Sequence, residues 1–470
     1  MTLPNWNNFF KSYDVRGLVE SELSVPVVRA IGAAFADFLQ ASGESIVVGH
    51  DMRVSSPELA AAFSEGANLR GANVELIGLC STDMTYFASG SRGLPAAMFT
   101  ASHNPASYNG IKLSRSGAQG LSLATGLSEV RDLAQRYFTA GIPGASSTGI
   151  TTEVNLLREY AEYLRSLVAL QPQRKLRIVV DAANGMAGLT VPAVFGQSAG
   201  LPHLPVEIIP LYFELDGTFP NHEANPLEPK NLLDLLGAVR ANGADLGLAF
   251  DGDADRCFAV DELGHAVSPS AIGSLVAARE IARVAARGET HPSVLHNLLS
   301  SRAVAEGIVR GGGQPIRTRV GHSLIKDEMA RTNAVFGTEH SAHYYFREFW
   351  GADNGMLAAL HVVAELLEDP RPMSQLAAEL TPYFQSGEIN FPVGDVAAAQ
   401  QAVVQVLQSD EIDRLDGLTI SSSGELTDWW WVNVRPSNTE PLLRLNVEAA
   451  KRETMERIRH LAAGVLANAV

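Results

Sequence analysis

Three aspartates stand at alternate positions of the short stretch DGDADR, residues 251–256. In an extended or tightly turned loop, alternate side chains can point the same way, so Asp251, Asp253 and Asp255 could converge on one divalent cation. Mg²⁺ suits such a set of hard oxygen ligands, above all where a substrate phosphate completes its shell. A calcium-binding EF-hand loop is the competing interpretation, because Glu262 falls at the last position of that loop. However, an EF-hand needs glycine where Arg256 stands, and strand-like runs flank the stretch, so the sequence favours Mg²⁺.

A second polar stretch, RPSNTEP at residues 435–441, combines a permanent cation with two hydroxyls and an amide. The guanidinium of Arg435 could grip a phosphate through two parallel hydrogen bonds. The alternative is a simple polar turn between two strands, but such a turn more often carries glycine than arginine and three small donors. The stretch therefore predicts a phosphate-binding loop.

A third stretch, TASHNP at residues 100–105, offers Ser102 and His103. Adjacent residues seldom form a nucleophile–base pair, so a hydrolase triad is a weak interpretation. A serine here could also simply cap a helix. Near Mg²⁺ and an arginine, however, the hydroxyl of Ser102 could carry a phosphoryl group. Lys112 could add a positive charge, although by itself it is more typical of a surface lysine.

The fourth stretch is TEHSAH, residues 338–343. Glu339 beside Ser341 puts a carboxylate next to a hydroxyl, which suits binding of sugar hydroxyls. Single histidines on a strand are usually structural. This stretch alone therefore indicates little.

Similar elements precede three of these stretches. Three segments open with strand-like runs, at residues 45–53, 176–185 and 292–302, and each continues to a second strand-like run. Each ends in a third run, at residues 94–99, 244–250 and 333–337, directly before a polar stretch. Strands that alternate with helices predict α/β units. Because open α/β sheets bind ligands beyond the carboxyl ends of their strands, each unit would offer one loop to a shared cleft.

The expected fold class is therefore α/β, with three similar α/β domains containing mixed or parallel sheets. The tail differs, because residues 417–450 suggest antiparallel strands around RPSNTEP and an amphipathic helix follows. It predicts a C-terminal α+β domain. Polar loops rich in small residues place the domains at 1–150, 151–262, 263–371 and 372–470.

The bulk properties limit the partners and the compartment. The 470 residues carry a formal net charge of −16, which argues against nucleic-acid binding because that depends on Lys and Arg neutralising phosphates. Cys80 and Cys257 are the only cysteines, so the chain has no disulfide framework and suits a reducing compartment. The first residues lack a signal-peptide pattern, and no apolar run approaches the ~18 residues of a membrane span. We therefore expect a cytoplasmic protein without a membrane partner.

Together the four stretches, in this order, resemble the α-D-phosphohexomutase family, most closely its phosphomannomutase/phosphoglucomutase branch. The resemblance covers nearly the whole chain, from YDVRG at residues 13–17 to RPSNTEPLLRLNVEA at residues 435–449. It implies that the three α/β domains and the C-terminal α+β domain surround a central cleft. It implies an isomerase that interconverts hexose 1-phosphate and hexose 6-phosphate, of mannose, glucose or both, through a phosphoserine and a 1,6-bisphosphate. SNTEP is similar to hexose mutases, whereas phosphoglucosamine mutases typically carry SGTEP. A phosphoglucosamine mutase, a Mg²⁺-dependent sugar phosphatase and a sugar-phosphate sensor on the same scaffold remain alternatives.

The resemblance also implies roles for individual residues. Ser102 would be the phosphoserine and would hold Mg²⁺ together with Asp251, Asp253 and Asp255. The other catalytic positions would be His103, Lys112, Arg16 and His343, of which Lys112 and His343 are the candidates for proton transfer. The substrate-binding positions would be Tyr13, Arg256, His322, Lys326, Glu339, Ser341, Arg435, Ser437, Asn438 and Thr439.

The implied partners are small sugar phosphates, with Mg²⁺ as cofactor and glucose 1,6-bisphosphate or mannose 1,6-bisphosphate as activator. The chain would act as a monomer or homodimer. Three departures from the family pattern stand out. Thr338 and Ala342 replace common glycines, and Leu299 occupies a position that is often lysine in relatives. If that lysine helps proton transfer in relatives, it cannot do so here.

Overall fold

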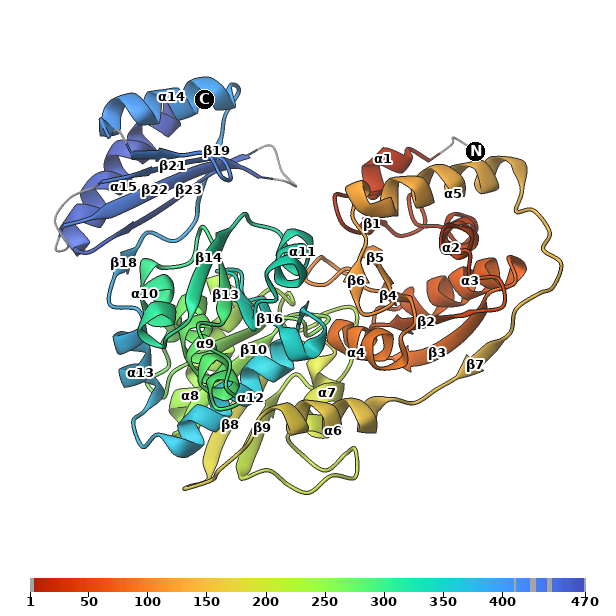
Figure 1. Ribbon diagram of the computed structural model, residues 1–470, viewed down its shortest axis with the longest axis horizontal. Helices are drawn as coiled ribbons and strands as arrows, with labels where there is room; N and C mark the ends of the chain where they lie inside the picture. Colours follow the sequence, from red (N-terminus) through yellow and green to blue (C-terminus); the bar gives the residue numbers. More distant parts are fainter. Residues whose placement is uncertain (1–3, 410, 423–427, 438–441, 469–470) are drawn as a thin grey trace.

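The structure, a computed structural model, describes residues 4–409, 411–422, 428–437 and 442–468 (Figure 1). The strands form four sheets, and we number domains I to IV after them in chain order. Figure 1 shows domain I (red and orange) and domain IV (blue) at opposite sides, with domains II and III between them. Within the described residues, no helix combines the length and the apolar character that crossing a membrane requires.

Domain I extends from α1 to β7. Its helices are α1 (Trp6–Phe9), α2 (Val25–Phe38), α3 (Ser56–Leu69), α4 (Thr82–Arg92), the π-helical turn η1 (Leu123–Leu127) and α5 (Ser128–Ala140). Its strands are β1 (Val15–Leu18), β2 (Ser45–His50), β3 (Asn73–Leu79), β4 (Ala96–Phe99), β5 (Tyr108–Arg115), β6 (Gln119–Gly120) and β7 (Thr151–Glu153). They are ordered β1-β5-β4-β2-β3-β7, with β6 on β5. Strands β4, β2, β3 and β7 are parallel, and β5 runs antiparallel to β4.

Domain II extends from α6 to β12. Its helices are α6 (Leu157–Leu167), α7 (Ala187–Val194), the short 3₁₀ turn η2 (Pro229–Leu232) and α8 (Leu233–Asn242). Its strands are β8 (Leu176–Asp181), β9 (Val206–Leu211), β10 (Leu246–Phe250), β11 (Cys257–Val260) and β12 (Ala266–Val267), ordered β12-β11-β10-β8-β9. Strands β10, β8 and β9 are parallel, and β11 is antiparallel to β10.

Domain III extends from α9 to α13. Its helices are α9 (Pro269–Ala285), α10 (Arg302–Arg310), α11 (His322–Thr332), the 3₁₀ turn η3 (Arg347–Phe349), α12 (Gly355–Glu368) and α13 (Met373–Leu380). Its strands are β13 (Ser293–Asn297), β14 (Gln314–Thr318), β15 (Phe336–Thr338), β16 (Tyr344–Phe346) and β17 (Ala352–Asp353), ordered β14-β13-β15-β16-β17. Strands β14, β13 and β15 are parallel, and β16 is antiparallel to β15.

The expected threefold repeat is present in these sheets. Four strands have the same order and directions in each domain: β5-β4-β2-β3, β11-β10-β8-β9 and β16-β15-β13-β14. In each case the third parallel strand turns back into the antiparallel one, and a polar loop makes that turn. All residues of β4, β10 and β15 are buried, as expected for central strands covered on both faces. The polar loop of each unit therefore lies at the equivalent position, the carboxyl end of a central strand.

Domain IV is the α+β unit that the tail predicts. It contains β18 (Phe384–Gln385), β19 (Ile389–Pro392), α14 (Val396–Leu407), β20 (Glu411–Asp413), β21 (Leu418–Ser421), β22 (Trp430–Pro436), β23 (Leu442–Ala449) and α15 (Arg452–Ala467). Its sheet is antiparallel in the order β18-β23-β22-β21-β20, with β19 also on β23. The phosphate-binding stretch lies between β22 and β23.

The apolar cores divide the molecule unevenly. One cluster runs continuously through domains I, II and III, from Val47 to Leu376. Domain I has a second cluster on the other face of its sheet, so that Ile46 and Val48 point away from Val47. Domain IV has a cluster of its own between Ala399 and Leu466. Domains I to III therefore share a core that domain IV does not enter.

Aromatic rings join the first three domains. Tyr163 on α6 stacks on Trp350 of domain III with ring centroids 5.3 Å apart, and Phe87 on α4 lies 5.5 Å from Tyr163. Gly90 on α4 allows this approach, because a Cβ there would lie 2.1 Å from Trp350. The three loops therefore stand on domains that are packed firmly together.

The expected boundaries at 150, 262 and 371 stay predictions, and the structure describes the elements next to them. β7, just after residue 150, pairs with β3 of domain I. α13, just after residue 371, contributes Met373 and Leu376 to the core of domains I to III. Both elements therefore pack with the domain that precedes them.

Candidate active site

Ser102 lies in the turn from β4 to β5. Its φ is 48°, in the left-handed region that non-glycine residues adopt only when their surroundings enforce it. Its N–H donates to Thr100 Oγ1 at 2.9 Å, and its Oγ donates to Asp251 Oδ2 at 2.7 Å. The structure thus brings the serine loop of domain I into contact with the acidic loop of domain II.

Asp251, Asp253 and Asp255 occupy the turn from β10 to β11. All three are buried, and one oxygen of each lies within 4.8 Å of the others. Within the described part of the chain, Asp253 Oδ1 and Asp255 Oδ1 are buried without a hydrogen-bond partner. Such oxygens are costly to leave unpaired, and a divalent cation would satisfy them. Strands rather than helices flank the turn, so it is not an EF-hand, and it fits a site for a metal ion.

Lys112 on β5 supplies positive charge to this turn. Its Nζ donates to Asp253 Oδ2 at 2.8 Å and to Asp255 Oδ2 at 2.6 Å. Burial opposes the charged form of Lys112, but the two carboxylates raise its pKa well above the ordinary value, so it remains an ammonium. It is therefore no ordinary surface lysine.

The carboxylates of the turn differ in their tendency to ionise. Burial alone would raise the pKa of Asp253, but Lys112 and a 2.6 Å hydrogen bond from Thr82 Oγ1 lower it below its usual range. At Asp251 burial prevails and raises the pKa to about 7, against the opposing charge of Arg256. Without a cation, Asp253 is therefore ionised at neutral pH and Asp251 is close to its midpoint.

Arg256 connects this turn with the serine loop. Its Nε donates to Asp251 Oδ2 at 2.8 Å, and an Nη donates to Nδ1 of His103 at 2.7 Å and to Ser102 Oγ at 3.4 Å. Burial lowers the pKa of His103 well below its usual value, and Arg256 lowers it further. His103 is therefore a neutral acceptor that helps to fix the guanidinium beside Ser102.

The stretch from domain III begins at the end of β15. Glu339 is buried, and its carboxylate accepts hydrogen bonds from Tyr345 Oη at 2.7 Å and from the Gly321 N–H at 3.1 Å. Nδ1 of His343 lies 3.0 Å from Ser341 Oγ and 3.6 Å from Glu339 Oε2. Ser341 and Glu339 therefore hold one nitrogen of the imidazole in place.

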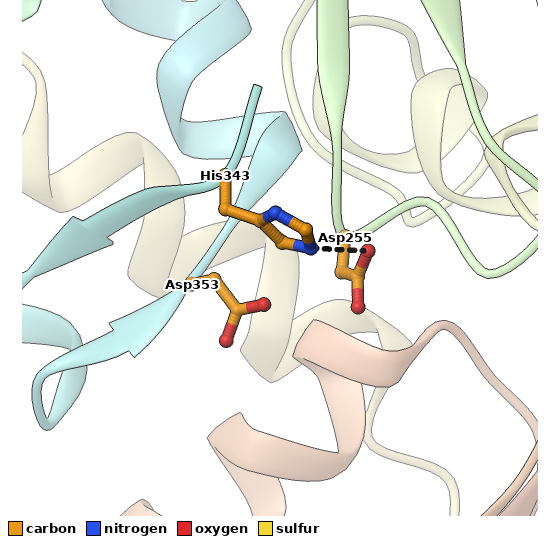
Figure 2. A group of neighbouring side chains, drawn as sticks. All are labelled: Asp255, His343 and Asp353. Carbon is orange, nitrogen blue, oxygen red and sulfur yellow. Dashed lines mark ion pairs between the residues drawn. The ribbon is translucent and has the colours of Figure 1, made fainter. Parts of the chain in front are cut away.

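The other imidazole nitrogen faces the acidic turn. His343 Nε2 lies 4.0 Å from Asp255 Oδ1, and Figure 2 shows the ring between Asp255 and Asp353. One potential ligand atom of each of these three residues lies within 4.8 Å of the others. Domain III thus places an imidazole beside the carboxylates of domain II.

The remaining residues implied by resemblance in domains I and III lie around these loops. Arg16 on β1 donates to Asn104 Oδ1 at 2.8 Å and to Asp14 Oδ2 at 2.6 Å, so it contacts the serine loop. Tyr13 is half-buried just before β1. Lys326 on α11 pairs with Asp353 Oδ1 at 2.7 Å and lies over the ring of Tyr86 at 3.8 Å.

Lys326 is thus held at the contact between domains I and III. His322 is the first residue of α11, and its side chain lies outside the description.

Domain IV carries the predicted phosphate-binding residues. Arg435 on β22 is 4% exposed, and an Nη lies 3.4 Å from Glu388 Oε2. The Ser437 N–H donates to the Leu442 carbonyl at 2.8 Å. Asn438 and Thr439 lie outside the described residues, so their expected role stays a prediction.

Three further polar residues next to the site were missed from the sequence. Thr82 donates to Asp253, Tyr345 donates to Glu339, and Asp353 lies beside His343 and Lys326. Thr82 follows the second strand of the first unit, so its place in the repeat could have indicated it. No comparable signal marked Tyr345 or Asp353.

The structure shows where the three departures from the family pattern lie. Thr338 is buried against α9 at Gly273, where a Cβ would lie 2.4 Å from Thr338 Oγ1. Ala342 adopts a φ of 65°, the conformation for which glycine is the usual residue. Leu299 is 7% exposed in the turn after β13. It adds an apolar side chain where a lysine would add a charge.

Comparison with known families decides the assignment. Phosphoglucomutase/phosphomannomutase alpha/beta/alpha domains I, II and III match residues 7–137, 158–264 and 269–384, and the C-terminal domain matches residues 388–465. The chain belongs to this family. Its resemblance to the phosphohexomutases is thereby confirmed, and the chain is an enzyme of a family of isomerases in carbohydrate metabolism.

Individual relatives agree with the family. A protein of Xanthomonas campestris pv. campestris (strain ATCC 33913) named "Phosphohexose mutases" is 40% identical over 95% of both chains. A phosphomannomutase of Escherichia coli (strain K12) is 36% identical over 94% of both. The crystal structure of a phosphoglucomutase/phosphomannomutase family protein from Burkholderia thailandensis is 29% identical, with a TM-score of 0.84 over 98% of this chain and 97% of that one. The four-domain arrangement is therefore that of the phosphohexomutases.

Proposed function

We propose that the chain interconverts hexose 1-phosphates and hexose 6-phosphates through a phosphorylated Ser102 and a hexose 1,6-bisphosphate. The main support is the 2.7 Å contact between Ser102 Oγ and Asp251, with Arg256 on the same carboxylate. It joins a phosphoryl-accepting oxygen, a cation site and a fixed positive charge, which are the requirements of phosphoryl transfer. A relative named phosphomannomutase supports mannose as a sugar, and another named phosphomannomutase/phosphoglucomutase supports glucose.

In the first transfer, the free hydroxyl of the sugar phosphate attacks the phosphorus of phospho-Ser102. The bond from phosphorus to Ser102 Oγ breaks, a bond to the sugar oxygen forms, and the hydroxyl proton passes to His343 Nε2. The bisphosphate then turns over and returns its other phosphoryl group to Ser102 Oγ. His343 gives the proton back to the sugar oxygen that is released, so atoms and charges balance over the cycle.

The charged residues divide the remaining work. Lys112 stays protonated between two carboxylates, so it supplies charge and not a base. Asp251, Asp253 and Asp255, with an oxygen on Ser102, would hold Mg²⁺, which when bound neutralises charge on the phosphoryl group. Arg256 stays beside Ser102 Oγ throughout.

The other end of the substrate lies with domains III and IV. Glu339 and Ser341 would bind sugar hydroxyls that both orientations share, and Arg435 and Ser437 would bind the phosphate that is not transferred. The substrates are small sugar phosphates. Glucose 1,6-bisphosphate or mannose 1,6-bisphosphate would act as activator, because it can phosphorylate Ser102 again after an intermediate has escaped. The chain would work as a monomer or homodimer.

The test supplies purified protein with Mg²⁺ and the 1-phosphates of mannose, glucose and glucosamine in separate reactions. We expect mannose 6-phosphate, glucose 6-phosphate or both. Free sugar and inorganic phosphate would show a phosphatase, turnover of glucosamine 1-phosphate alone would show the glucosamine enzyme, and binding without turnover would show a sensor. Each of these results contradicts the proposal.

A matched pair of variants tests the phosphoserine. Ser102→Ala should lose most activity and carry no phosphoryl group by intact mass, because the change removes the accepting oxygen. Ser107→Ala is the control, since Ser107 is an exposed serine of the same loop. Wild-type turnover by Ser102→Ala would show that another group accepts the phosphoryl group.

A further inference from the structure

Arg53, which follows β2, is a buried arginine bound almost entirely to backbone. Its side chain is 1% exposed. Its two Nη atoms donate to four carbonyl oxygens of the serine loop: Pro105 at 2.8 Å, Tyr108 at 3.0 Å, Ser102 at 2.9 Å and Asn104 at 2.7 Å. One guanidinium therefore gathers the carbonyls on one side of the loop that runs from residue 102 to residue 108.

The guanidinium is itself held from two sides. Asp51 accepts from its Nε at 3.2 Å and from the Arg53 backbone N–H at 3.0 Å, and Ser56 Oγ donates to Asp51 at 2.6 Å. On the other side, the ring of Phe219 from domain II covers the guanidinium at 5.1 Å. Gly217 makes this approach possible, because a Cβ there would lie 2.5 Å from the Cα of Arg53. Domain II therefore closes a site that domain I builds.

The contacts of Ser102 show what this arrangement holds in place. Its carbonyl is bound to Arg53, its N–H to Thr100 Oγ1, and its Oγ to Asp251. The residue keeps a left-handed φ of 48°, which persists only where the surroundings over-determine it. Because the carbonyls of the loop turn toward Arg53, the hydroxyl of Ser102 is left facing the acidic turn.

We infer that Arg53 is a positioning residue for phosphoryl transfer, which fixes the Ser102–Tyr108 backbone so that Ser102 Oγ faces the cation site. This inference rests on the proposed function. Arg53 affects the reaction only through the position of the loop. Because the Phe219 ring packs on Arg53, the shape of the loop also depends on how domain II packs against domain I. The planar fork of arginine, with five donors, is suited to this task, whereas lysine supplies a point charge with three.

The test compares Arg53→Lys with Arg165→Lys. Arg165 is a matched control, because it also donates to three backbone carbonyls, those of Val194, Pro202 and Gly196, but does so within domain II. We expect Arg53→Lys to lower kcat by roughly a hundredfold, the effect of a misplacement of about 1 Å, with KM within about twofold. Arg165→Lys should leave kcat unchanged. Equal losses of kcat in both variants would overturn the inference.

Chemical rescue separates a positioning role from a general loss of stability. Arg53→Ala should regain part of its kcat when guanidinium chloride is added at low millimolar concentration, and it should not do so with methylammonium chloride. Two results with a folded Arg53→Ala would contradict the inference: neither cation restores kcat, or both cations restore it. Either result would show that the loop does not require a guanidinium group. If Arg53→Ala does not fold, Phe219→Leu replaces it in the test, because this variant keeps Arg53 and removes only the ring that covers its guanidinium.

Amide hydrogen exchange tests the inference without any turnover. In Arg53→Lys and Phe219→Leu, exchange at residues 102–108 should be faster than in the wild type, while exchange in β8 and β9 should be unchanged. Unchanged exchange in the loop would overturn the positioning role even if the protein is a mutase. Faster exchange in the loop of a protein that shows no mutase activity would instead contradict the proposed function and leave the structural part of the inference standing.

Discussion

Binding of Mg²⁺ should weaken steeply as the pH falls below neutrality. A cation needs the ionised carboxylate of Asp251, and burial raises the pKa of this group to about 7. Lys112 lowers the pKa of Asp253, so that carboxylate stays ionised over the same range. Binding of the cation must therefore displace one proton below about pH 7, and that proton comes from Asp251.

The size of the effect follows from that single proton. With a pKa of about 7, the ionised fraction of Asp251 falls about fivefold between pH 7 and pH 6 and about tenfold for each further pH unit, so the affinity for Mg²⁺ should fall by the same factors. Above about pH 8 it should be nearly constant. The affinity changes in this direction because burial favours the neutral form of Asp251. At acid pH the carboxyl group keeps its proton and cannot bind the metal ion.

The assay must avoid other groups that titrate nearby, because phosphate monoesters have a pKa of about 6. We would measure Mg²⁺ binding by calorimetry on Ser102→Ala without substrate, in two buffers of different ionisation enthalpy, and count the protons released. The hydrogen bond from Ser102 Oγ lowers the pKa of Asp251, and Ser102→Ala removes it. In this variant the affinity for Mg²⁺ should therefore begin to fall at a higher pH than in the dephosphorylated wild type. Constant affinity from pH 6 to pH 8 with no proton release would refute the reasoning.

Three further predictions concern other groups. Asp253→Asn should raise the Mg²⁺ concentration for half-maximal activity, because it replaces a charged ligand by an amide; an unchanged Mg²⁺ titration would place the cation elsewhere. Arg435→Ala should lower kcat/KM by roughly one to two decades, mostly through KM, because a charge-assisted hydrogen bond contributes about 1.5–3 kcal/mol. Arg435→Lys should restore only part of this loss, because a point charge replaces the fork. A collapse of kcat alone in steady-state kinetics would contradict this role. Burial raises the pKa of Asp83 from its ordinary value to about 7, so its stabilising contribution is complete below about pH 4 and is lost progressively as the pH rises from there through about 7. Asp83→Asn should therefore flatten the fall in Tm between pH 5 and pH 8, and parallel Tm curves would show that Asp83 is not the group concerned.

The sequence predicted the threefold repeat because the signal is redundant. Each unit repeats three strand-like runs and then a polar stretch, and strands β4, β10 and β15 end where those stretches begin. The rule that ligands bind at the carboxyl ends of parallel strands then predicts that Ser102 and Asp251 meet, although 149 residues separate them. Residue type and topology together were enough for this contact.

Other contacts of the site could not be predicted in that way. Arg53 binds carbonyl groups, which every residue carries, so nothing in the types of residues 102 to 108 indicates its partner. Lys112 looked like a surface lysine, because its two carboxylate partners belong to another domain. β7 extends the first sheet through backbone pairing with β3 alone, and a strand of three exposed residues has no apolar pattern to reveal it.

The separate core of domain IV has a consequence for how enzymes of this type diversify. Its apolar cluster is contained between Ala399 and Leu466, and polar contacts such as the Arg302 N–H to Glu448 at 2.9 Å tie it to domain III. A substitution inside that cluster should affect domain IV alone, whereas a substitution in the core of domains I to III should affect the loops of all three domains. The part of the chain that would hold the far phosphate is thus the part most open to exchange. A chimera that takes domain IV from a relative should therefore keep a working Ser102 and the sugar contacts of Glu339 and Ser341, and should change only how tightly the far phosphate is held.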